Sequence, residues 1–119
     1  MIIINDSRKI IDIKEEFNSL FPYLKIEFFT NFNNQNYTNK LIKKNSNTLG
    51  ECRTIQNNLN ITITPTTTVA DLDFQFRKVY GLKIELYRKS GKEIWLETTL
   101  TDSWTLEEQN RQGEALSKK

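Results

Sequence analysis

Histidine is missing from this chain, and cysteine occurs once, as Cys52. The absence of imidazole excludes histidine-ligated zinc sites, Ser-His-Asp and Cys-His nucleophile pairs, and imidazole acid–base catalysis. One thiol allows neither an intramolecular disulfide nor a cysteine-rich zinc site, which agrees with a reducing compartment. With four glycines and two prolines, the chain also carries no glycine-rich phosphate loop. We therefore expect no catalytic residue, no metal and no cofactor, and favour a protein that is not an enzyme.

Long apolar runs are missing as well. No stretch approaches the roughly 18 residues of a membrane-spanning helix, and the apolar start of the chain already ends at Asn5, too early for a secretory signal. We therefore predict a cytoplasmic protein that does not enter a membrane. The net charge is only +2, whereas nucleic-acid-binding domains concentrate basic charge far more strongly. A nucleic-acid partner is accordingly disfavoured.

A repeated pattern is the most informative feature that the sequence does contain. Residues 2–29 align with residues 61–87 if Tyr23 is treated as a one-residue insertion, and Leu24–Glu27 returns unchanged as Leu82–Glu85. The other identical pairs are Ile2/Ile61, Ile4/Ile63, Asp12/Asp71 and Phe17/Phe76. A Thr-x-x-Glu capping signal, typical of a helix start, follows in both halves as Thr48–Glu51 and Thr105–Glu108. This self-similarity predicts an internal duplication.

Helical spacing of apolar residues predicts one long helix in each repeat, over Arg8–Phe21 and Val69–Tyr80. Thr68 is a favourable N-cap for the second helix, because an aspartate follows three residues later. The first helix has a lysine at the matching position, so we expect Asp6 or Ser7 to cap it. A shorter helix should follow each capping signal.

Alternation of apolar and polar residues predicts the strands. The expected strands are Ile2–Ile4, Leu24–Phe29, Tyr37–Lys43, Asn60–Thr64, Leu82–Tyr87 and Glu93–Leu100. Ser90-Gly91 has the composition of a tight hairpin turn, whereas the matching connection in the first repeat, Thr30–Asn36, is a long asparagine-rich loop.

A repeat of about 58 residues is marginal alone, because small domains bury too little surface. We therefore predict one domain, 1–119, in which repeats 1–58 and 59–119 share a core. The predicted fold class is α+β. It is a two-layer α/β sandwich with a mixed sheet of about six strands, built by duplication of a β-α-β-β-α unit and broadly ferredoxin-like. A pseudo-two-fold axis should relate the repeats, with the helices mostly on one face.

Aromatic residues on the polar side of the strands form the first candidate surface. Phe29, Tyr87 and Trp95 share this parity with lysines and with Glu97. Three interpretations stay open: cross-strand pairs that stabilise the sheet, a protein-binding face and a platform for stacking nucleic-acid bases. The third is disfavoured, because the alternating glycine-aromatic motif is missing and the glutamates would repel phosphate.

Two further candidates lie in the second repeat. Phe74 is off the apolar stripe of its helix, so it either contacts a partner or, as we favour, is covered by the helix predicted over Leu106–Gly113. Trp104 stands in a connection rich in polar oxygens, close in sequence to Asp102. It is interpreted either as a lid on the core or as part of a ligand site that also uses Glu97.

The sequence thus favours a non-enzymatic interaction module that binds another protein or forms a homodimer. The candidate interaction surface consists of Phe29, Phe74, Tyr87, Trp95, Glu97, Asp102 and Trp104. The first alternative is a nucleic-acid-binding module that uses the aromatics of the sheet. The second alternative is a small-ligand-binding or enzymatic domain with a site near Trp104.

Overall fold

The computed structural model describes residues 1–31 and 39–118 and shows an α+β chain. The strands are β1 (Ile2–Ile4), β2 (Leu24–Asn31), β3 (Asn39–Leu41), β4 (Ile61–Ile63), β5 (Leu82–Lys89) and β6 (Trp95–Glu97). The helices are α1 (Ile10–Leu20), α2 (Leu49–Cys52), α3 (Val69–Tyr80) and α4 (Leu106–Ser117), with a 3₁₀ turn, η1 (Thr99–Thr101), before α4. The loop expected over Thr30–Asn36 lies outside the described residues from position 32 onward, and positions 30 and 31 belong to β2.

The strands form two antiparallel sheets. The larger has the order β3-β2-β5-β6, and the smaller is a ribbon of β1 and β4 alone. The prediction of one mixed sheet of about six strands is therefore wrong for the part of the chain that the structure describes. The two three-residue strands pair with each other and bury one face of the ribbon. Alternation in the sequence indicated which face of these strands is buried, but not which strand each one pairs with.

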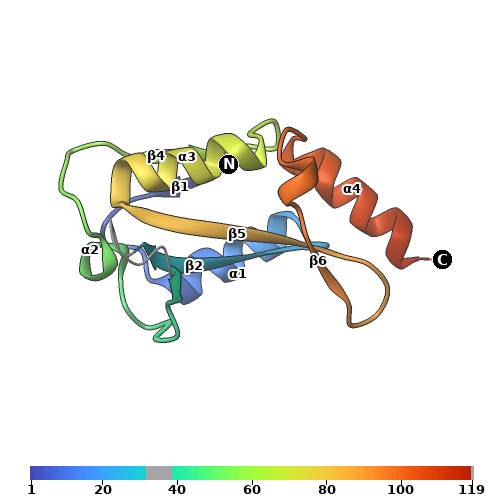
Figure 1. Ribbon diagram of the computed structural model, residues 1–119, viewed down its shortest axis with the longest axis horizontal. Coiled ribbons are helices and arrows are strands. Elements are labelled where there is room, and N and C mark those ends of the chain that lie inside the picture. The colour runs from blue at the N-terminus through green and yellow to red at the C-terminus, as the bar shows by residue number, and fades with distance from the viewer. Residues whose placement is uncertain (32–38, 119) are drawn as a thin grey trace.

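Each long helix packs against one strand of the ribbon and one central strand of the larger sheet. Helix α1 lies against β1 and β2, and α3 lies against β4 and β5. Figure 1 shows α3 beside the ribbon, α1 alongside β2, and α2 and α4 at opposite ends of the molecule. All these elements contribute to one buried cluster, in which the rings of Phe28 and Phe76 meet edge to face at 5.3 Å. Burial of this apolar surface is the main stabilising contribution to the fold.

Local signals at the helix ends are confirmed in α2 and α3 and differ elsewhere. The Thr68 side chain caps α3, and Thr48 forms a complete capping box with α2. Thr105 caps α4, but the carboxylate of Glu108 bonds to Arg111 and Gln112 instead of reaching back. Helix α1 begins after Lys9 without a side-chain cap, so the expectation of Asp6 or Ser7 in that role is wrong. Asp6 instead binds Arg53, and the Ser7 hydroxyl binds an asparagine of the same loop.

Corresponding backbone contacts occur in the two halves. In the ribbon, Ile2 lies opposite Ile63 and Ile4 opposite Ile61. In the larger sheet, Leu24 lies opposite Arg88 and Thr30 opposite Leu82, so the pairing is centred on Glu27 and Glu85. The start of each long helix also donates hydrogen bonds to the loop before the next helix. In the first half, Ile10 N donates to Asn47 O and Ile11 N to Asn45 O. In the second half, Val69 N donates to Trp104 O and Ala70 N to Asp102 O.

Candidate functional site

The polar face of the larger sheet holds four of the predicted site residues, Phe29, Tyr87, Trp95 and Glu97. All except the exposed Glu97 are half-buried. Lys25 lies between two of the rings, with its Nζ 5.4 Å from the centre of Tyr87 and 5.0 Å from that of Trp95. Burial raises the pKa of the Tyr87 hydroxyl, and nearby carboxylates raise it further.

Two glutamates on this face, Glu27 and Glu85, are paired with lysines. Lys14 Nζ lies 2.9 Å from Glu27, and Lys83 Nζ lies 3.4 Å from Glu85. The two glutamates face each other across β2 and β5, and such like-charge neighbours destabilise a sheet unless cations compensate. Because Lys25 already occupies ring faces, the geometry favours cross-strand stabilisation over base stacking.

Phe74 is 62% exposed, so the expectation that the C-terminal helix covers it is wrong. Helix α4 packs instead over the start of β2 and the end of β5. The contact is close at Gly113, where a Cβ atom would lie 2.9 Å from the Cβ of Tyr23 and 3.1 Å from the Cγ of Arg88. Because Gly113 lets α4 approach Tyr23 and Arg88 this closely, the helix lies away from Phe74, whose ring remains exposed.

Trp104 is half-buried, and the Arg88 guanidinium lies 5.4 Å from its ring centre. Arg88 also donates to Gln109, which is fully buried and bonds to Thr101. This arrangement is a stacked, hydrogen-bonded support for η1 and α4. Trp104 lies on Arg88 and is not among the residues of the buried core cluster, so its interpretation as a lid on the core stays a prediction.

Asp102 lines a small cavity of about 150 Å³ beside β5 and α3. Asp73, Lys83 and Thr98 are among its other lining residues, whereas Trp104 and Glu97 are not. The side chains proposed for a ligand site near Trp104 are therefore not brought together. The seven predicted residues divide between the sheet face, the outside of α3 and the loop before α4, and form no single surface.

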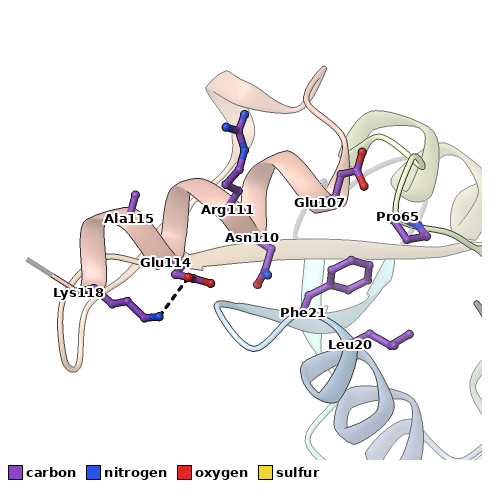
Figure 2. A pocket seen from close by; sticks show the side chains of 9 residues that line it. All are labelled: Leu20, Phe21, Pro65, Glu107, Asn110, Arg111, Glu114, Ala115 and Lys118. Carbon is purple, nitrogen blue, oxygen red and sulfur yellow. Dashed lines mark hydrogen bonds and ion pairs between the residues drawn. The ribbon is translucent and has the colours of Figure 1, made fainter.

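A groove of about 520 Å³ lies between α4 and the end of α1, a place that the sequence did not indicate. Its lining residues are Leu20, Phe21, Pro65, Glu107, Asn110, Arg111, Glu114, Ala115 and Lys118. Figure 2 shows Phe21 pointing toward α4, with Asn110, Glu114 and Lys118 on the side of the helix that faces it, and Arg111 pointing away. The groove thus has an aromatic ring on one wall and polar groups on the other.

Most charges of the groove are compensated locally. Lys118 Nζ bonds to Glu114 at 3.1 Å, which raises the pKa of the lysine. Arg111 bonds to Glu108 and lowers the pKa of that carboxyl. Glu107 forms no ion pair or side-chain hydrogen bond within residues 1–31 and 39–118. The uncompensated charge of the groove is therefore negative.

The other end of the molecule contains a buried arginine. The Arg53 side chain is 2% exposed, and its Nη1 donates to Asp6 at 2.6 Å. Its Nη2 donates to Val79 O and its Nε to Ile55 O, both at 2.7 Å. The guanidinium lies 4.7 Å from the centre of the Tyr80 ring. This side chain thereby ties the segment after α2 to the end of α3.

Metal-binding clusters of three or more His, Cys, Asp or Glu residues do not occur in the described ranges. Among the helices that the structure describes, none has the length and apolar character to cross a membrane. Cys52 is half-buried, and burial raises the pKa of its thiol. Comparison of the chain with protein-family models, curated proteins and solved structures found no match.

A signal for the groove was nevertheless present in the sequence. Glu107, Asn110, Glu114 and Lys118 follow one another at three- and four-residue spacing, so they share one face of α4. A polar face of this kind is usually solvated, and its proximity to Leu20 arises only from packing.

Proposed function

We propose that this chain is a small, cytoplasmic, non-enzymatic module that binds another protein through the groove between α1 and α4. The observation that carries the proposal is the groove itself, which combines an apolar wall with the carboxylate of Glu107, unpaired among the residues that the structure describes. Its volume of about 520 Å³ suits a large side chain and the peptide that bears it. The chain contains no histidine that could act in acid–base catalysis. The half-buried thiol of Cys52 has a raised pKa, which disfavours the reactive thiolate.

The arrangement of the groove supports a peptide rather than a nucleic acid. Its free charge is negative and would repel phosphate. Leu20 is 47% exposed at its rim, so an apolar contact is available without any rearrangement. Protein interfaces commonly combine an apolar centre with a polar rim.

We also propose that the two halves descend from a duplicated β-α-β-β-α unit. The support is the pairing of equivalent positions across a common centre, Ile3 with Thr62 in the ribbon and Glu27 with Glu85 in the larger sheet. The proposal matters for function because the halves differ most at their last helices. Helix α2 has 4 residues, whereas α4 has 12 and forms one wall of the groove.

Selection of peptides from a random displayed library against the whole chain tests the interaction function. Amide shifts in ¹H–¹⁵N spectra should then place a selected peptide at Leu20, Asn110 and Ala115. The two alanines of the chain supply matched variants, because both are exposed on helices. Ala115→Trp should weaken binding at least about tenfold, by obstructing the groove, whereas Ala70→Trp on α3 should not.

The proposal fails if no selected peptide distinguishes these two variants. It also fails if the shifts map to another face, such as that of Phe74. Light scattering tests self-association: a dimer abolished by Ala115→Trp would identify a second copy as the occupant.

A further inference from the structure

We propose that the groove receives an arginine side chain presented by the partner protein. This inference rests on the proposed function and specifies what the groove recognises. It comes from the corresponding position in the first half of the chain, which already contains an arginine. The first half therefore indicates that a guanidinium group fits a pocket of this kind.

Backbone contacts establish the correspondence. Gly50 N donates to Asp6 O at 3.0 Å, and Glu107 N donates to Pro65 O at the same distance. One residue earlier, Leu49 N donates to Arg8 O and Leu106 N to Thr67 O, both at 2.9 Å. The first turns of α2 and α4 are thus docked in the same way. Arg53 directly follows α2, where its N–H still bonds to Leu49 O, and Asn110 of α4 stands at the same distance along the chain from Leu106.

The surroundings of Arg53 are matched by the walls of the groove. Tyr80, which lies under the guanidinium, corresponds to Phe21, and Val79 corresponds to Leu20. The carbonyl of Val79 accepts a hydrogen bond from Arg53, whereas that of Leu20 accepts none from the residues that the structure describes. The groove therefore offers the carbonyl that a guanidinium uses in the first half, together with the small accessible part of Phe21, which is 4% exposed.

Asn110 does not fill the place of the arginine. Its side chain is shorter, and its Oδ1 is engaged with Tyr23 N at 2.8 Å. The remaining space is the groove, where the guanidinium of Arg111, one of the lining residues, points away from Phe21 and is engaged by Glu108. An arginine must then come from outside α4.

The charge of the site agrees with a cationic occupant. In the first half, Asp6 supplies the carboxylate, and its counterpart in the second half is Pro65. Glu107 lies in the first turn of α4, directly beside the Pro65 contact, and is unpaired among the described residues. A planar guanidinium is favoured over an ammonium, because it can contact an aromatic ring while donating to a carboxylate and a carbonyl.

Blocked arginine, N-acetyl-arginine-N-methylamide, provides a direct probe. Titrated into the ¹⁵N-labelled chain, it should shift the amides of Leu20, Phe21 and Asn110. Blocked lysine should bind more weakly, and blocked citrulline, which has nearly the same shape without the charge, should give no saturable shift.

Variants separate the groove from nonspecific attraction. Glu107→Gln should weaken binding of blocked arginine about threefold or more, whereas Glu15→Gln, an exposed position on α1, should leave it unchanged. Asn110→Arg should abolish the response by supplying the guanidinium from within the chain. Circular dichroism checks that each variant is folded.

Equal responses to arginine and citrulline, or equal effects of Glu107→Gln and Glu15→Gln, would overturn the inference. If selected peptides occupy the groove without needing an arginine, the inference fails and the proposed function stands. If Ala115→Trp affects no peptide, both fail.

Discussion

Replacement of Arg53 by alanine is the most informative perturbation of the fold. The guanidinium bonds to the main-chain carbonyls of Ile55 and Val79, contacts the ring of Tyr80 and pairs with Asp6. Three of these contacts are with neutral groups, and the fourth is with a carboxylate that is 57% exposed. The arginine should therefore stabilise the fold chiefly as a tether between carbonyls, and only secondarily as an ion pair.

The magnitudes follow from these contacts. Each hydrogen bond to a carbonyl contributes about 1 kcal/mol net, since water can enter in the variant, and the stacked ring contributes about 1 kcal/mol. The pair with the exposed carboxylate contributes less than about 1 kcal/mol. Arg53→Ala should then cost about 3 kcal/mol of unfolding free energy, and Asp6→Asn less than about 1 kcal/mol.

Urea unfolding followed by circular dichroism measures both values, with Arg53→Lys as an intermediate that keeps the charge and loses the planar fork. Arg53→Ala should also lower Tm by about 10 °C in a chain of this size. A cost below about 1 kcal/mol for Arg53→Ala would refute the tether. Equal costs for Arg53→Ala and Asp6→Asn would show that the ion pair dominates.

Three further substitutions test other parts of the structure. Gly81→Ala should cost about 1–2 kcal/mol, because Gly81 has a φ of 67° and an added Cβ would collide with the Thr54 hydroxyl; an unchanged urea midpoint would contradict this. Phe74→Ser should change stability by less than about 0.5 kcal/mol, because the ring is exposed, and a cost above about 1 kcal/mol in the same assay would reveal a cover. Tyr87 has a raised pKa, so its contribution to stability is fully present below the unfolded pKa of about 10 and is lost as pH rises through the folded pKa. Tyr87→Phe should therefore flatten the decline of unfolding free energy between about pH 9.5 and 11, and equal slopes would exclude this role.

Local structure was predictable from the sequence wherever one signal had no competitor. Helix α3 has the predicted bounds because Thr68 caps its start and Gly81 its end. The alternation in β2 and β5 correctly separated buried from polar positions. The second capping box failed because Glu108 has Arg111 within reach one turn later, a competition that the four-residue motif does not display.

Tertiary relations were less accessible. Ile2 and Ile4 have the pattern of strand residues with one buried face, which is equally compatible with a six-stranded sheet and with a separate ribbon. The groove joins Leu20 to Glu107, positions that only packing brings together. The expectation that α4 covers Phe74 was wrong because the residues of α4 do not indicate which part of the fold the helix packs against.

The exchange of strands between the halves has a consequence for synthesis of the chain on the ribosome. Residues 2–4 pair with residues 61–63, which are made much later, and β2 pairs over most of its length with β5, beyond its three-residue contact with β3. Pairings between residues so far apart in the sequence slow folding and prolong the lifetime of aggregation-prone intermediates. We expect a nascent chain stalled before residue 82 to leave Leu24, Ile26 and Phe28 without their neighbours in β5, and therefore to depend on chaperones far more than the finished protein does.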